Sequence, residues 1–175
     1  MPLAAEHGEE GSLMMAKRDA QHANFQVAVD LLGELGYATI PASFTDSTNP
    51  ALRFELPLPS LPEAPTLTAV IAPVNEATIS ILVPNLGTDL GDEDNSERLR
   101  AWALNVNYTG IYVRVGIDAR DGEVRFIGVF PSAGLTAALL TDVIAEFGEV
   151  ALEYLTLIAL RRPGATAPEA PIRFE

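Results

Sequence analysis

Two clusters of carboxylate and imidazole side chains have the residue types to bind a metal ion. The first places Glu6, His7, Glu9 and Glu10 within one short stretch, and a divalent ion accepts such ligands. The only other histidine, His22, belongs to a separate predicted helix. Because no ordered neighbours accompany the first cluster, we interpret it as part of a solvated acidic leader and predict no metal site there.

The second cluster is the acidic run of residues 89–94, which invites comparison with a calcium-binding loop. The run lacks the alternating Asp/Asn spacing that ends in glycine, and no glutamate closes a loop of the required length. Asp94 and Glu97 instead form the pattern of a capping box. Further carboxylates are favourable near the positive end of a helix dipole. We therefore interpret the run as the start of a helix.

The residue types that covalent catalysis requires are scarce. The chain has no cysteine, which excludes disulfides, thiolate metal sites and cysteine nucleophiles. It has a single lysine, Lys17, outside any glycine-rich phosphate loop, and it has no G-x-S-x-G nucleophile elbow. Composition leaves a hydrolase with paired carboxylates open, although carboxylates in helix caps and solvent-facing stripes make poor general acids. The sequence predicts a protein that is not an enzyme and uses no cofactor.

The balance of charge restricts the partners. Eleven Lys and Arg residues against 24 Asp and Glu residues give a formal net charge of −13. This charge repels phosphate backbones and anionic membrane surfaces, so we expect neither direct nucleic-acid binding nor membrane binding. It favours a basic partner protein. The alternative interpretation is that the charge only confers solubility.

The hydropathy pattern gives no targeting or membrane segment. The N-terminus has neither a basic region nor an apolar core of the kind that signal peptides contain. The most apolar stretch, residues 134–160, is interrupted by Asp142, Glu146, Glu149 and Glu153, and a membrane span does not tolerate four carboxylates. We expect a cytoplasmic protein.

The elements that position these residues follow from hydrophobic periodicity and turn signals. A helix is predicted from about Met14 to Gly36, a second one after Asp94, and a third over residues 139–160. Alternating apolar residues predict strands at 52–58, 66–72, 78–83, 111–117 and 124–130. The resulting order, α-β-β-β-α-β-β-α, predicts an α+β fold with an antiparallel sheet of about five strands and helices packed on one face.

The chain length suits a single domain. We expect a flexible acidic leader at residues 1–13, one domain at residues 14–162, and a flexible Pro/Ala-rich tail at residues 163–175.

The last helix carries more apolar rows than packing on a sheet requires. Beside its main apolar face runs a further row of Ala145, Leu152 and Ala159, with Leu155 next to it. One interpretation is that the other two helices cover this row. The other is that it contacts a second copy or a partner, because an exposed large apolar side chain forfeits about 1.5–3 kcal/mol of burial. The second interpretation predicts a homodimer.

The predicted hairpin offers a second candidate interface. Tyr112, Arg114 and Asp118 share one face of its first strand, and Arg125 lies on the second strand. Tyrosine and arginine are enriched at binding hot spots, so Tyr112, Arg114 and Arg125 are candidate interface residues. The alternative is an ordinary solvated strand face.

The sequence resembles the YbjN-like family, whose fold is that of type III secretion chaperones. The resemblance covers residues 15–160 and rests on Leu104-Asn105, the hairpin around Asp121-Gly122, the Gly134-Leu135-Thr136 helix start and Leu35-Gly36-Tyr37 at the end of the first helix. The Pro-rich residues 57–65 depart from the family pattern. The resemblance implies a small, acidic, commonly dimeric protein that presents grooves and exposed strands to an extended segment of its partner. It supplies no catalytic residue.

Together these features predict a non-catalytic adaptor or chaperone-like regulatory protein that docks a partner protein by strand addition or groove binding, with a basic, nucleic-acid-binding client favoured. The alternative is a regulatory module that senses a small molecule held between sheet and helices.

Overall fold

The structure is a computed structural model that describes residues 6–42, 50–58, 67–84, 86, 93–118 and 122–159. Its elements are α1 (Glu6–Glu34), β1 (Ile40–Pro41), β2 (Leu52–Leu56), β3 (Leu67–Pro73), β4 (Thr78–Val83), α2 (Glu93–Thr109), β5 (Val113–Ile117), β6 (Val124–Pro131) and α3 (Ala137–Ala159). The predicted tail, residues 163–175, lies outside the described residues, as does most of the acidic run 89–94.

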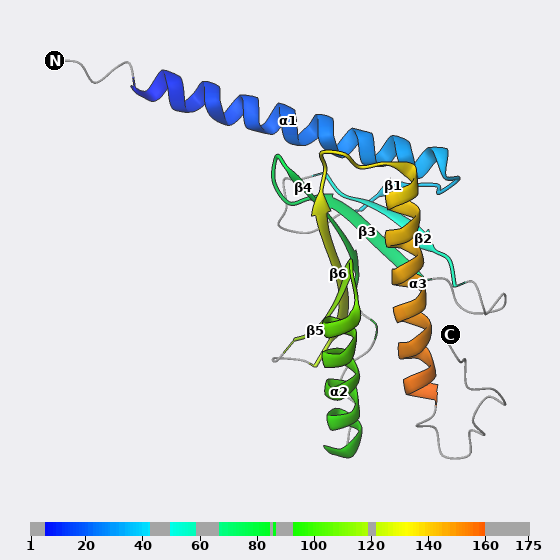
Figure 1. Ribbon diagram of the computed structural model, residues 1–175. Helices are drawn as coiled ribbons and strands as arrows, with labels where there is room; N and C mark the ends of the chain where they lie inside the picture. The colour runs from blue at the N-terminus through cyan, green and yellow to red at the C-terminus, as the bar shows by residue number, and fades with distance from the viewer. Residues whose placement is uncertain are drawn as a thin grey trace.

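The strands form a single antiparallel sheet in the order β1-β2-β3-β4-β6-β5, with helices α2 and α3 beside it (Figure 1). The α+β class, the antiparallel pairing and the element order predicted from the sequence are therefore confirmed. The sheet has six strands and not five, because the two-residue strand β1 pairs Ile40 with Arg53 and Pro41 with Leu52. A strand of two residues has no alternation from which it could have been predicted.

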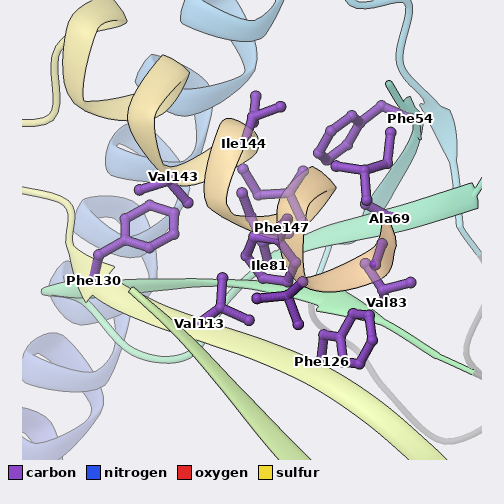
Figure 2. Packing of buried hydrophobic residues seen from close by; sticks show 14 of the residues in the cluster. Phe54, Ala69, Ile81, Val83, Val113, Phe126, Phe130, Val143, Ile144 and Phe147 are labelled. Atoms are coloured by element: carbon purple, nitrogen blue, oxygen red, sulfur yellow. The ribbon is translucent and has the colours of Figure 1, made fainter. Parts of the chain in front are cut away.

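Alternation along the strands builds one core between the sheet and the helices. Ile79, Ile81 and Val83 of β4 are buried on one face, while Ser80 and Leu82 between them are only half-buried. The buried faces of the other strands point the same way and meet α3 in one hydrophobic cluster (Figure 2). At its centre the sheet and α3 touch, since a Cβ added to Gly128 would lie 2.9 Å from Cε2 of Phe147.

Helix α1 begins at Glu6 and not near Met14, so it extends into the predicted leader. Acidic residues in the first turns favour a helix start there through the helix dipole. The C-terminal half packs on the body through Phe25, Ala28 and Leu32, which are buried. The N-terminal half projects beyond the sheet (Figure 1), and residues 12–20 are exposed on every side.

The end of α1 is the one predicted. Gly36 has φ of 87°, the left-handed conformation that glycine adopts most easily. The amide of Tyr37 donates to the carbonyl of Leu32 at 2.9 Å, and the amide of Gly36 donates to Gly33 at 3.0 Å. This pair of hydrogen bonds is a Schellman motif, which stops the helix and turns the chain towards β1.

Within the described residues, none of the helices combines the length and the apolar character that crossing a membrane requires.

Candidate protein-binding surface

Most of the apolar surface of α3 is buried within the protein itself. Little of it remains for contact with a second copy or a partner. The main face, with Leu140, Phe147 and Tyr154, is buried in the core. Of the extra row, Ala145 and Ala159 are exposed, and Leu152 and Leu155 are half-buried.

Helix α2 covers one part of α3. The ring of Trp102 on α2 packs 5.7 Å from the ring of Tyr154, and its Nε1 donates to Oε2 of Glu153 at 3.0 Å. No described large apolar side chain of α3 is among the exposed ones. The sheet, α1 and α2 together therefore leave little of the apolar surface of α3 exposed, and the surplus predicted for α3 is small.

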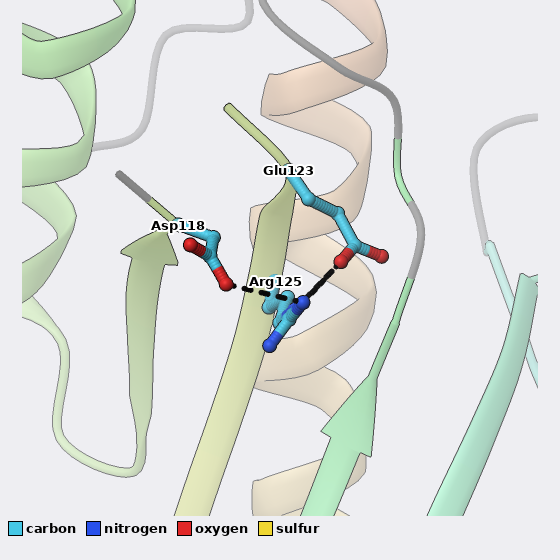
Figure 3. A network of polar contacts seen from close by, with 3 residues as sticks. All are labelled: Asp118, Glu123 and Arg125. Atoms are coloured by element: carbon cyan, nitrogen blue, oxygen red, sulfur yellow. Dashed lines mark hydrogen bonds and ion pairs between the residues drawn. The ribbon is translucent and has the colours of Figure 1, made fainter. Parts of the chain in front are cut away.

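The three candidate residues of the hairpin have different environments. Arg125 on β6 is ion-paired with Glu123 and lies 3.5 Å from Oδ2 of Asp118 (Figure 3), so its guanidinium is held within the hairpin. Tyr112 is half-buried against the core. Arg114 is exposed, and its Nη1 donates to the carbonyls of Gly110 at 2.9 Å and Val113 at 2.8 Å. Of the three, only Arg114 presents an exposed side chain.

The outer edge of β5 is blocked by side chains. The amide of Val115 donates to Oδ1 of Asn107 at 2.7 Å, and its carbonyl accepts from Nδ2 of the same side chain at 2.9 Å. The amide of Val113 donates to Oε1 of Glu146 at 3.0 Å. An added strand would have to displace these groups. The opposite edge is the short strand β1, where Pro41 has no amide hydrogen to donate. This arrangement disfavours strand addition at both ends of the sheet.

The most exposed large apolar side chains of the described residues are Tyr108 (89%), Ile111 (74%) and Leu104 (73%). Leu104 and Tyr108 are one helical turn apart on α2, Ala101 precedes them on the same face, and Ile111 follows in the turn after the helix. We call Ala101, Leu104, Tyr108 and Ile111 the α2 stripe. The stripe lies on the side of α2 opposite the buried residues. It was not predicted from the sequence, because the apolar residues recognised in this helix were those of its buried face.

The turn that carries Ile111 is held rigidly by Glu146 of α3. Oε1 of Glu146 accepts the amides of Ile111 at 2.9 Å and of Tyr112 at 3.1 Å, as well as that of Val113. Gly110 fits under this carboxylate only because it has no side chain, since a Cβ there would lie 2.9 Å from Oε1. The end of the stripe is therefore fixed before any partner binds, which lowers the entropic cost of binding.

Three arginines surround the α2 stripe. Arg98 and Arg100 fall on either side of it by helical geometry, and Arg114 lies on the strand that follows the turn. All three side chains are exposed, and within the described part of the chain none is ion-paired. Glu97 on the same helix face is exposed as well, and the first turn of α2 adds Glu93 and Asp94 to the sequence of this helix. The neighbourhood of the stripe thus carries charges of both signs, on a protein whose net charge is −13.

A second apolar feature lies on the face of the sheet away from the helices. Cross-strand pairing places Arg53, Val70, Leu82, Ile127 and Arg114 in one row. Only Ile127 of its apolar members is exposed. This row therefore offers less apolar contact than the α2 stripe.

No family model matches the chain, and no curated protein does. Among solved structures, the chain is similar to an uncharacterized protein from Methanothermobacter thermautotrophicus, with a TM-score of 0.59 and 14% sequence identity. The similarity covers 80% of this chain and 99% of that one. At this identity the likeness concerns the fold alone.

Proposed function

We propose that this chain is a non-catalytic protein-binding adaptor or chaperone-like regulatory protein, which docks its partner on the α2 stripe. The observation that carries the proposal is the exposure of Leu104, Tyr108 and Ile111 on a rigid turn and helix. Leaving such side chains in water forfeits about 1.5–3 kcal/mol each relative to burial. Large apolar side chains exposed together on one helix face and the turn after it are typical of an interaction site.

Two features of the sequence support the proposal. The resemblance to the YbjN-like family implies a partner-binding role, and the net charge of −13 favours a basic partner, such as a nucleic-acid-binding protein, during the long-range approach. A cytoplasmic location accords with both. The homodimer predicted from α3 has weaker support, since Leu152 and Leu155 are half-buried, and the proposed function does not require it.

The small-molecule sensor is supported less well. Such a module would hold its ligand between the sheet and the helices. At Gly128 these layers are in direct contact with each other through Phe147.

Affinity capture with mass spectrometry tests the proposal. The full chain is immobilised, and bound proteins are compared at about 50 mM and about 300 mM salt. The distance over which surface charges act differs strongly between these two concentrations. The matched control is Tyr108→Glu, which changes an 89% exposed side chain and should leave the fold intact. We expect a partner that the original chain retains and Tyr108→Glu loses. Capture of no protein at either salt concentration would contradict the proposed function.

A further inference from the structure

We propose that the projecting half of α1, residues 6–21, pairs antiparallel with the same half of a second copy of this chain. This contact is separate from the α2 stripe, so the inference goes beyond the proposed function and does not depend on it. Within this half, residues 12–20 are exposed on every side. They include three large apolar side chains, Leu13, Met14 and Met15, which are 59%, 65% and 69% exposed.

A helix in this position needs packing from another molecule. Isolated helices of up to about 12–15 residues are marginal in water, and most helical stability in proteins comes from packing. Gly8 and Gly11 lower the helix propensity of this half further. The body supports α1 at Asn24, whose Nδ2 donates to the carbonyl of Glu76 at 2.6 Å, and at Gln21, which is half-buried. In a single copy, residues 12–20 have no such cover.

The face of α1 that packs on the body continues into the projecting half. At 3.6 residues per turn, Met14, Gln21 and Phe25 fall in one row, with Leu13 and Lys17 beside it. Phe25 is buried in the core. A helix placed under Met14 would therefore extend a packed surface that the chain already has.

The order of residues along this half fits a second copy in the antiparallel orientation. The sequence has acids at positions 6, 9 and 10, apolar residues at 13–15, and bases at 17 and 18. Two copies that cross between Leu13 and Met14 place position 10 of each copy opposite position 17 of the other. An acid then meets a base at both ends, and apolar residues meet at the centre. A parallel pair would instead bring like charges together at both positions.

The remaining charges and the length of the helix are compatible with this pairing. Helical geometry places Asp19 on the side away from the paired face, and position 9 and Arg18 at its two margins. Residues 6–21 rise about 24 Å, and position 6 of one copy falls opposite Gln21 of the other, where the body begins. Because α1 projects beyond the sheet (Figure 1), the two bodies would lie at opposite ends of the paired helices.

Sedimentation equilibrium of the full chain tests the inference. The salt concentration is about 150 mM, which screens the long-range repulsion between two chains of net charge −13. We expect a mass of twice 18.7 kDa. Met14→Glu should weaken the dimer at least about tenfold, a change of about 1.4 kcal/mol. The matched control is Met15→Glu, the same change at an equally exposed neighbour on the far side of the helix, and it should leave association unchanged.

A charge exchange tests the antiparallel register. Glu10→Lys and Lys17→Glu should each weaken the dimer, because each places like charges opposite one another. Both changes in one chain should restore it, since acid and base then only exchange places. In a parallel pair, neither single change would weaken association.

Several outcomes would overturn the inference. These are a monomeric mass at every concentration, equal weakening by Met14→Glu and Met15→Glu, no recovery in the double variant, or loss of the dimer in Tyr108→Glu. A different protein that a monomeric chain captures and Met14→Glu loses would also overturn it. The proposed function is tested separately, because a partner that Met14→Glu retains and Tyr108→Glu loses supports the α2 stripe whatever the mass of the chain.

Discussion

Replacement of Glu146 by alanine should destabilise the protein strongly, although Glu146 is only one of several glutamates on α3. Its carboxylate accepts the amides of Ile111, Tyr112 and Val113. The amides of Tyr112 and Val113 are part-buried, whereas water can reach that of Ile111. Each buried donor left without an acceptor costs about 1–3 kcal/mol, so the two together should lower the free energy of unfolding by about 2–6 kcal/mol.

Urea denaturation followed by circular dichroism measures this change. With a slope of about 2 kcal/mol per molar urea, the midpoint should fall by roughly 1–3 M. The matched control is Glu149→Ala, an exposed glutamate on the same helix, which should change stability by no more than about 0.5 kcal/mol. Glu146→Gln should fall between the two, because the amide retains one acceptor oxygen but turns a donor towards the backbone.

Hydrogen exchange adds a local measurement. In Glu146→Ala, the amides of residues 111–113 should exchange faster than in the original chain under native conditions, because their acceptor is gone. Equal urea midpoints for Glu146→Ala and Glu149→Ala, with unchanged exchange at these amides, would refute the reasoning that this carboxylate organises the turn.

Three further predictions follow from other contacts. Gly128→Ala should cost about 1–3 kcal/mol in urea denaturation, because its Cβ would lie 2.9 Å from the ring of Phe147; Phe147→Leu in the same chain should recover part of this loss, and no recovery would contradict the packing argument. Asn107→Ala should free the β5 edge and raise the rate of aggregation measured by light scattering, whereas the exposed neighbour Asn105→Ala should not. Burial raises the pKa of Tyr37 above its ordinary value of 10.0, so its contribution to stability is present below about pH 10 and is lost as the pH rises further; Tyr37→Phe should show a smaller alkaline loss of stability, and identical pH profiles would contradict this.

The order of the elements, and the buried face of most of them, could be predicted from the sequence. Alternation in strands and periodicity in helices report burial directly. The stop of α1 at Gly36 followed from one residue with a known conformational preference. Strand β1 was missed because two residues carry no period, and the start of α1 was placed too late because the acidic leader resembled a solvated tail.

The candidate site was much harder to predict. Glu146 belonged to a solvent-facing stripe of acids in the sequence, and only the fold brings it to the amides of residues 111–113. Arg125 had the residue type of a hot spot, but its partners Glu123 and Asp118 become neighbours only through the hairpin. The exposure of Leu104 could have been predicted from the sequence, because helical spacing places this residue opposite the buried face of its own helix.

The projection of α1 has a practical consequence for surface-based assays. At about 1.5 Å per residue, its 29 residues form a rod of about 43 Å. Its free end and helix α2 lie at opposite extremes of the molecule (Figure 1). A chip linkage or fluorophore attached through the start of α1 would therefore stand away from Tyr108 and its neighbours, and the molecule would be tethered with its α2 side turned towards the solution.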